Sequence, residues 1–309
     1  MLALVSGYRA VRLENLSFFL SWAGVYALAG ASLFALWYTF GTRVVARAAA
    51  ATPEGGTVTF TERGPAGANV GRLASVFGWC ASIFLVLSLA LRSVVTGRPP
   101  YSDMWEYLLA FAAGVSLFAN IFTLRTRQAT LRAFAMPVAL AMGLCAQMIF
   151  SPTITPLIPA LQNNRLLALH VAAMLISYSV LGVAFGAAVM YLVQGDGRRF
   201  ARLPDGQTLD ELSYRAVLVG FPVLALGIAL GAYWGDYAWG RYWGWDPKET
   251  TALITWLVFA FYLHARALRG WRGSRVAWII VLGFVCIVFN IFAVNFWIAG
   301  LHSYAGPTQ

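Results

Sequence analysis

The sequence predicts an all-α membrane protein that crosses the bilayer about eight times, with both chain termini outside. Hydrophobic residues make up 60% of the 309 residues and charged residues only 11%, with a mean hydropathy of +0.70. Apolar runs long enough to cross a hydrocarbon core of about 30 Å recur along the chain. The net charge of +10 comes from arginines in the short segments between these runs. Membrane topology explains that placement better than binding to nucleic acid does.

The predicted spans, taken in order, begin close to the N-terminus. Ala27 to Ala29 resembles a signal-peptide cleavage site, but the apolar run continues to Phe40, so we expect an uncleaved span. The spans fall near residues 16–40, 73–91, 105–123, 133–150, 167–193, 214–233, 251–268 and 276–299.

The chain is expected to divide at residue 72. Residues 1–72 hold the first span and a polar, glycine-rich loop from 41 onward, which would form a short hairpin or nothing regular. Residues 73–309 form the main transmembrane domain. The cysteines lie far apart inside apolar runs without a C-x-x-C pair, so we interpret them as packing residues: Cys80, Cys145 and Cys286.

The basic residues predict how the chain is oriented. About two thirds of the 22 Lys and Arg residues fall on the side of the loop at 41–72, and cytoplasmic loops are rich in these residues. That side is therefore expected to be cytoplasmic. Arg9 and Arg12 favour the opposite orientation of the first helix.

Two loops on the predicted outer side contain proline. The segment from Gly97 to Glu106 (GRPPYSDMWE) is either a plain turn or the border of a site. The segment from Ser151 to Asn164 is expected to lie along the surface.

A third outer segment, Trp234 to Glu249 (WGDYAWGRYWGWDPKE), concentrates aromatic and polar residues between two apolar runs. Its glycines and Pro247 should break a helix, and its charges exclude it from lipid, which predicts a loop. One interpretation is an interfacial belt of Trp and Tyr. The other is an aromatic platform that stacks on a flat cofactor such as a porphyrin, with glycines allowing close approach.

The part of this loop from Trp239 to Glu249 (WGRYWGWDPKE) resembles the tryptophan-rich WWD signature of haem-handling cytochrome c biogenesis proteins, W-G-x-x-W-x-W-D-x-K-E. Chain length, span count and histidine placement are most similar to the CcsA (ResC) family, membrane subunits of the system II cytochrome c synthase. The resemblance covers roughly residues 75–305. It includes NFWIAGLHSYAG around His302.

Two of the three histidines are expected at the outer side. His170 begins the fifth span and His302 follows the eighth, so both reach the face that carries the Trp-rich loop. A lone interfacial histidine is usually an ordinary polar residue. Two flanking an aromatic loop fit the axial ligands of haem iron, one on each face, which is also what the resemblance implies.

The third histidine, His264, lies about 20 Å along a helix that starts near Thr251, and so in the cytoplasmic half of the bilayer. An ionisable residue there is a functional candidate. The alternatives are a hydrogen bond to a neighbouring helix or an interfacial position beside Arg266.

The resemblance implies a protein that receives haem b, moves it outward and presents it for thioether attachment to the CXXCH motif of apocytochrome c. It implies a CcsB (ResB)-like membrane partner in a bacterial inner membrane, and an enzyme subunit without a nucleophile of its own. The residues expected to present or bind haem are Trp234, Trp239, Trp243, Trp245, Asp246 and Tyr242, with His170, His302 and His264 on the iron and Arg241 or Lys248 at the propionates. The alternatives are a CcmC-like haem exporter, a membrane cytochrome b and a transporter with an aromatic gate.

Overall fold

The computed structural model describes residues 2–42, 44–51, 57–63, 65–157, 161–162, 165–195, 199–298 and 300–302. Eight helices in these ranges are long and apolar enough to cross a membrane, which confirms the predicted class and span number. Because lipid offers backbone groups no hydrogen-bond partners, such runs must form helices. The helices are α1 (Leu2–Leu36), α2 (Pro65–Thr96), α3 (Met104–Thr126), α4 (Arg132–Ile149), α5 (Arg165–Gln194), α6 (Gly206–Trp239), α7 (Pro247–Leu268) and α8 (Ser274–Phe296).

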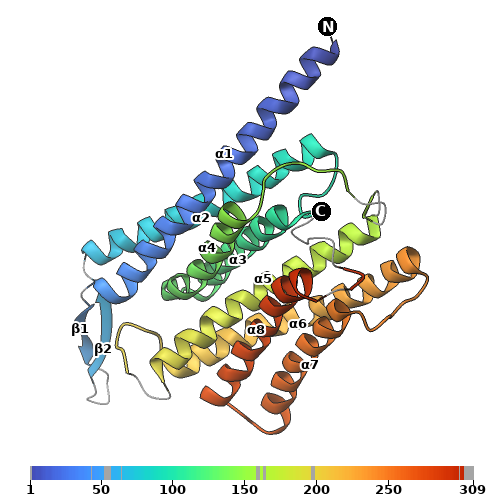
Figure 1. Cartoon of the computed structure of the whole chain (residues 1–309). Coiled ribbons are helices and arrows are strands. Elements are labelled where there is room, and N and C mark those ends of the chain that lie inside the picture. Colours follow the sequence, from blue (N-terminus) through green and yellow to red (C-terminus); the bar gives the residue numbers. More distant parts are fainter. Residues whose placement is uncertain are drawn as a thin grey trace.

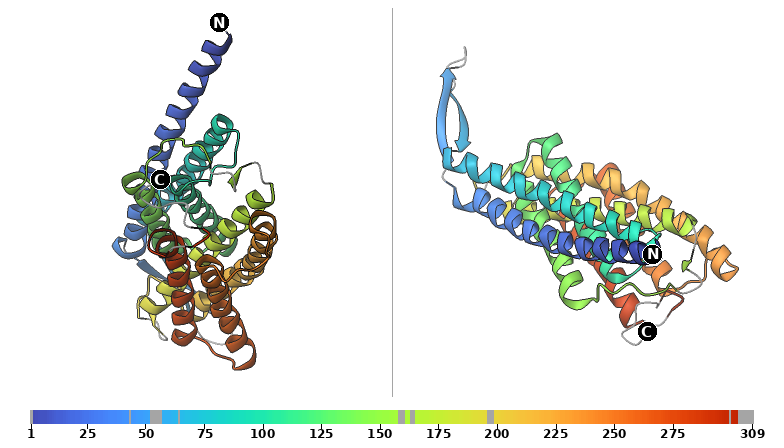
Figure 2. Two further views of the ribbon diagram at one scale, coloured as in Figure 1. Left: turned by 45° about the vertical axis from the view of Figure 1, so that its right-hand side comes forward. Right: turned by 90° about the horizontal axis from the view of Figure 1, so that it is seen from above.

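Shorter elements complete the chain. A π-helical turn, η1 (Trp37–Gly41), ends the first span, and a 3-10 turn, η2 (Ala129–Leu131), precedes α4. Between α1 and α2 the chain forms an antiparallel hairpin of β1 (Val44–Ala51) and β2 (Thr57–Arg63), so the loop at 41–72 contains regular structure. The hairpin extends away from the helices (Figure 2). The predicted division at residue 72 falls inside α2, and α1 packs along α2 as part of the bundle.

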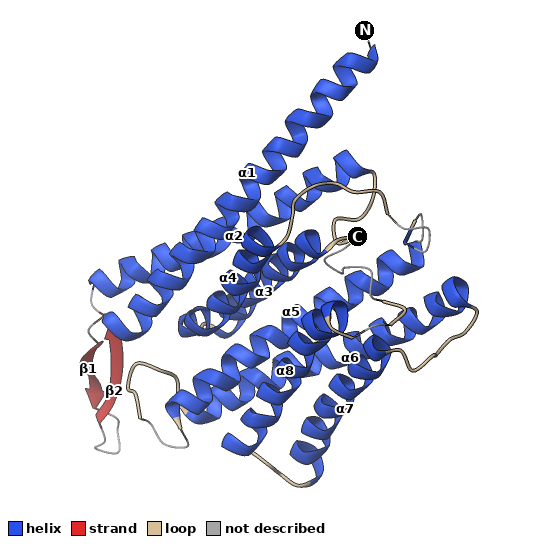
Figure 3. Cartoon of the chain, in the orientation of Figure 1, coloured by secondary structure: helices blue, strands red, loops and turns tan. Residues whose placement is uncertain are grey.

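The connections between helices lie at two opposite ends of the bundle. The α2–α3, α4–α5 and α6–α7 loops and the segment after α8 share one end (Figure 1). The hairpin and the α5–α6 and α7–α8 loops lie at the other (Figure 3). We call these the outer and the inner end, following the orientation predicted from the basic residues.

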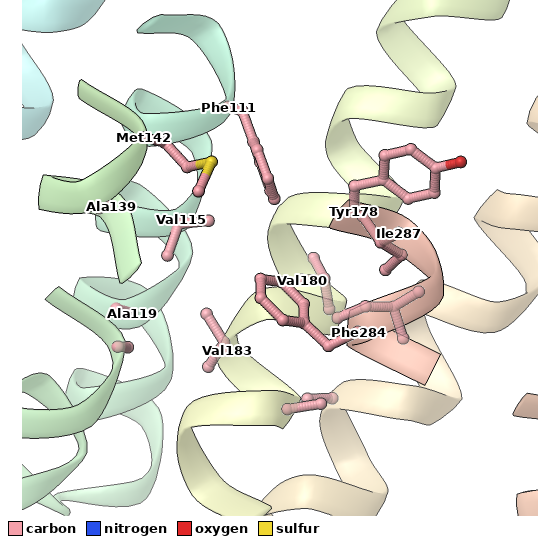
Figure 4. Packing of buried hydrophobic residues seen from close by; sticks show 14 of the residues in the cluster. Phe111, Val115, Ala119, Ala139, Met142, Tyr178, Val180, Val183, Phe284 and Ile287 are labelled. Atoms are coloured by element: carbon pink, nitrogen blue, oxygen red, sulfur yellow. The ribbon is translucent and has the colours of Figure 1, made fainter. Parts of the chain in front are cut away.

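The core joins two groups of helices, α1–α4 and α5–α8. Phe111 and Val115 on α3 lie opposite Val180 and Val183 on α5, and Phe284 on α8 packs behind them (Figure 4). The Phe284 ring stacks on Phe185 with ring centres 4.3 Å apart. This packing fixes α5 between α3, α6 and α8, and so determines where residues at the outer end of α5 point.

Candidate ligand-binding cavity at the outer end

A cavity of about 680 Å³ opens at the outer end among α3, α5, α6, α7 and α8. This volume lies within the range of about 300–1,000 Å³ that small-molecule and cofactor sites occupy. Five of the residues singled out in the sequence reach its wall, each from a different helix or loop: His170, Trp234, Trp243, Lys248 and His302. The structure thus brings both outer histidines to one cavity.

His170 lies in the first turns of α5 and faces α6. Its Nδ1 is 2.7 Å from the carbonyl oxygen of Gly227. One turn further along α6, a Cβ placed on Gly231 would lie 2.6 Å from Cε1 of the His170 ring. The glycine at 231 is therefore what leaves room for the imidazole between the two helices.

His302 follows α8 and is held by the Trp-rich loop. Its Nδ1 lies 2.8 Å from Oδ2 of Asp246, which is only 5% exposed. The other carboxylate oxygen of Asp246 accepts from the Leu301 amide. Because Asp246 is also the N-cap of α7 in a capping box with Glu249, one buried carboxylate ties the end of the chain to the start of α7.

Hydrogen bonding offsets the cost of burying Asp246. Burial alone would raise the pKa of this carboxyl, but bonds from His302 and from the Lys248 and Leu301 amides lower it below its usual value. The carboxylate therefore stays ionised at neutral pH and serves as a fixed acceptor.

The partners of the two histidines determine their tautomers. A backbone carbonyl and an ionised carboxylate can only accept hydrogen bonds, so Nδ1 carries the proton in both His170 and His302. A neutral imidazole with its proton on Nδ1 has its lone pair on Nε2. In both rings, therefore, Nδ1–H donates to a protein oxygen and Nε2 is left to bind a metal, which is how metal-binding histidines are usually held.

The aromatic residues do not form one flat platform. Trp234 is 1% exposed and lines the cavity, while Trp239 lies behind it with ring centres 4.7 Å apart. Trp239 also meets the His302 ring edge-on at 4.9 Å. Trp243 lines the cavity, whereas Trp245 is 68% exposed and has a positive φ of 55°.

The prediction of a loop from residue 234 onward is wrong for its first part. Helix α6 continues through Gly235 to Trp239 and ends at Gly240, whose φ of 71° suits a glycine at a helix C-terminus. An isolated glycine costs an α-helix only about 1 kcal/mol, which packing of Trp234 offsets. Trp234 and Trp239 are therefore positioned by helical spacing.

Two predicted cofactor-binding residues lie outside the cavity lining. Tyr242 is 56% exposed and stacks on Tyr233, and the nearby carboxylate of Asp236 raises the pKa of its phenol. The Arg241 side chain folds over Gly244 at the exposed surface. Lys248 is placed differently: it lines the cavity, and its Nζ donates to Oδ1 of Asn295 at 2.6 Å. Of the two cations considered for propionates, the structure brings only Lys248 to the cavity.

The segment at 97–106 borders the cavity, which decides between a plain turn and a site border. Tyr101 donates from its hydroxyl to the Ala168 carbonyl at 2.7 Å and so holds the loop against the base of α5. Behind it, Arg92 and Glu106 form an ion pair at 2.9 Å and are almost completely buried. Burial and the neighbouring Glu106 raise the pKa of Asp103, the N-cap of α3, to about 6.

Several lining residues were not identified from the sequence. Asn290 and Asn295 on α8 line the cavity, and polar side chains inside an otherwise apolar span were a usable signal. Tyr178 also lines it and was not singled out. Within the described ranges, its hydroxyl and the Nε1 of the predicted Trp234 are covered from solvent and have no hydrogen-bond partner, which is rare for buried donors.

His264 is not among the residues that line the cavity and lies near the C-terminal, inner end of α7. Its side chain is exposed on the surface of the helical bundle. It belongs to a stripe of exposed apolar residues at helical spacing: Leu257, Phe261 and Leu268. The interpretation of His264 as a packing histidine bonded to a neighbouring helix is not supported by the contacts of the described residues.

Comparison with known proteins shows the same relationship that the motif suggested. Residues 101–302 match the family described as Cytochrome C assembly protein. The chain is 38% identical over 249 residues to the cytochrome c biogenesis protein CcsA of Guillardia theta, covering 72% of this chain and 82% of the relative. It is 34% identical over 278 residues to CcsA of Gloeobacter violaceus, covering 70% of this chain and 81% of the relative.

A solved structure shares the fold. Cytochrome c haem lyase CcmF superposes with a TM-score of 0.67 over 91% of this chain at 18% identity, which shows the fold alone. The chain spans 46% of CcmF.

The eight-span bundle, the outer cavity and these matches define a multi-pass membrane protein of cytochrome c biogenesis. Within that class, the chain belongs to the Cytochrome C assembly protein family and is of the CcsA type. The resemblance drawn from the Trp-rich motif is confirmed.

Proposed function

We propose that this protein binds haem in the outer cavity and presents it for attachment to the CXXCH motif of apocytochrome c, as a subunit of a cytochrome c synthase. The observation that carries the proposal is the pair of histidines. His170 and His302 reach one cavity from different helices, and each donates its Nδ1–H to a fixed acceptor. Imidazole Nε2 atoms prepared in this way suit the two axial positions of haem iron.

The rest of the cavity wall fits the other parts of haem. Trp234 and Trp243 offer aromatic surface to the porphyrin, and Lys248 offers a cation to a propionate. The Tyr178 side chain also lines this space and adds aromatic surface. Trp239 and Asp246 do not line the cavity. Both contact His302 and would hold its ring in place.

Thioether attachment of haem requires no reactive group from this protein. In thioether formation a substrate thiol adds across a haem vinyl group: a carbon–sulfur bond forms, the hydrogen goes to the neighbouring vinyl carbon, and no oxidant is consumed. No nucleophile is required from this protein. Its contribution is position, because a haem held with its vinyl edge near two thiols makes the addition effectively intramolecular.

A second, inner haem site would explain His264. The residue is exposed on an apolar stripe of α7, so a haem bound there would take its other axial ligand from another chain. A histidine of a CcsB (ResB)-like membrane subunit fits that role. Haem would then pass from the inner site to the outer cavity, in a bacterial cytoplasmic membrane with the Trp-rich loop on the outer face.

The absorption spectrum of the purified protein tests the outer site. Protein from haem-replete cells, with and without a co-expressed partner, should show the Soret band of six-coordinate haem. The double variant His170→Ala, His302→Ala should lose outer-cavity haem and cytochrome c maturation while staying in the membrane. Because His264 is outside the cavity, His264→Ala serves as the matched histidine control when haem is added directly to the purified protein: it should load the outer cavity, and the double variant should not.

Two results would contradict the proposal. Normal maturation in the double variant would exclude the two histidines as required ligands. Wild-type protein without Soret absorbance under haem-replete conditions would favour the alternative of a solute transporter with an aromatic gate.

A further inference from the structure

The two outer histidines differ in what holds them. His302 donates its Nδ1–H to the carboxylate of Asp246, and His170 donates to the neutral carbonyl of Gly227. A carboxylate acceptor withdraws the Nδ1 proton more strongly and gives the ring partial imidazolate character, which raises its basicity as a metal ligand. Hydrogen bonds to a charged acceptor are also about twice as strong as those between neutral groups.

The two rings also differ in backbone support. His170 is carried by α5, so its position is fixed by the helix. His302 lies in the segment after α8, where no helix positions it. Asp246 supplies the missing support by binding both the Leu301 amide and the His302 ring, while its own backbone is anchored at the start of α7. Packing of the His302 ring edge-on against Trp239 adds a second restraint.

From this asymmetry we infer that Asp246 is a positioning residue that makes His302 the retained axial ligand of the outer haem, and that His170 is the ligand that yields to the incoming CXXCH histidine. This inference rests on the proposed function and assigns the order of events at the same site.

The exchange is balanced without any redox partner. The iron–nitrogen bond to His170 breaks, and a bond to the incoming imidazole forms through that ring's own lone pair. His170 leaves as a neutral imidazole that keeps its Nδ1–H bond to Gly227. No proton or electron is transferred, and the bond to His302 persists on the opposite face.

Single-histidine variants test the order. Haem-loaded His170→Gly should retain haem through His302 as a five-coordinate species and should take up added imidazole at the vacated position. His302→Gly should lose about 10- to 100-fold more haem affinity, the range that second-sphere partners contribute at metal sites. Equal haem loss in the two variants, or greater loss in His170→Gly, would overturn the inference.

Asp246→Asn tests the carboxylate separately. Asparagine caps helices as well as aspartate does, and its one oxygen can still accept from His302 and the Lys248 amide, so the variant removes the charge and the bond from the Leu301 amide while keeping the cap. The haem reduction potential should rise, because the ferric state loses the stronger donor, and added imidazole should displace His302 more readily. Asp205→Asn, which changes the cap of α6 at the inner end, is the matched control. An unchanged haem reduction potential in Asp246→Asn would contradict the role assigned to the carboxylate.

These outcomes separate the inference from the proposed function. If the wild-type protein binds no haem in its outer cavity, the proposed function fails. If it binds haem but loses it equally in both single-histidine variants, only the assigned order fails.

Discussion

The histidines at the outer and inner ends of the molecule differ in their burial and in their hydrogen bonding. At the outer end, His170 and His302 are half-buried, hydrogen-bonded and turned toward one cavity within a single chain. Toward the inner end, His264 is exposed on an apolar face of α7. A polar side chain exposed on a membrane-spanning surface is costly unless another protein covers it. Under the proposed function, the outer site is built from this chain alone, whereas the inner site takes a ligand from a second chain.

The largest effect is expected from His264→Gly. It removes the histidine that we propose as a ligand of the inner haem, so inner-site haem and cytochrome c maturation should both be lost. The deleted ring leaves a space that added imidazole can fill, and maturation should recover with imidazole. Quantifying haem in the co-purified complex, with cytochrome c yield in cells, provides the measurement.

The control for this variant is Leu257→Gly, which removes an exposed side chain from the same face of α7 and has the same helix-weakening glycine. It should retain inner haem. Full haem loading and maturation in His264→Gly without imidazole would show that His264 is not a haem ligand and that the inner site has to be placed elsewhere.

Gly231→Ala should damage the outer site alone. The added Cβ would lie 2.6 Å from the His170 ring, and overpacking of this kind costs about 1–3 kcal/mol. Displacing the ring should lower outer-haem retention by about tenfold, measured as haem loss to a competing apoprotein, while inner haem is unchanged.

A matched steric change is available in Gly283→Ala on α8, where the new Cβ would lie 2.6 Å from the Phe259 ring. This variant should show a similar loss of thermal stability with normal haem retention. Equal haem loss in both variants would mean that general strain, not the placement of His170, controls binding.

A smaller difference is expected between two neighbouring tryptophans. Trp243 lines the cavity and Trp245 is 68% exposed, so Trp243→Ala should weaken haem retention by about 1 kcal/mol beyond the lost area, and Trp245→Ala by less. Haem titration of the two single variants and the double variant measures this. Unchanged haem content in the double variant would support the alternative interpretation, that these rings form an interfacial belt.

The smallest effect on haem binding is expected from the buried charges beside the cavity, which should act on the stability of the fold instead. The pKa of Asp103 is raised to about 6 from its usual 3.8, chiefly by burial. The folded protein therefore holds this proton more tightly than the unfolded chain does. The resulting stability, under about 3 kcal/mol, is complete below pH 3.8 and is lost as the pH rises through 6.

Asp103→Asn keeps an N-cap for α3 and removes the titration. Thermal unfolding in detergent between pH 4 and 7 should then show a flatter pH dependence than the wild type. Glu211→Gln, at an exposed carboxylate of the inner end, should leave the slope unchanged. If Asp103→Asn and the wild type follow the same curve, the charge of Asp103 does not couple to folding.

The sequence by itself determined the membrane class, the number of spans and the fact that two histidines and the Trp-rich loop share one end of the bundle. Backbone groups in lipid must be satisfied within each span, so apolar length alone specifies a helix. Helix parity then places His170, His302 and the Trp-rich loop at one end, because every span reverses the chain. The WWD motif indicated the family because its residues lie within one short stretch of the chain, so their spacing can be read directly from the sequence.

Only the tertiary structure decided which side chains meet. The bond between His302 and Asp246 joins residues 56 positions apart, and the bond between His170 and Gly227 joins two helices through a backbone carbonyl that has no sequence signature. Likewise, only the structure shows that α6 continues through Gly235. It also shows that the Trp243 ring lines the cavity while the Trp245 ring is exposed on the surface. Helices that satisfy their own backbones are free to pack in many ways. The choice among those ways depends on side-chain fit across the bundle, which periodicity and composition do not encode.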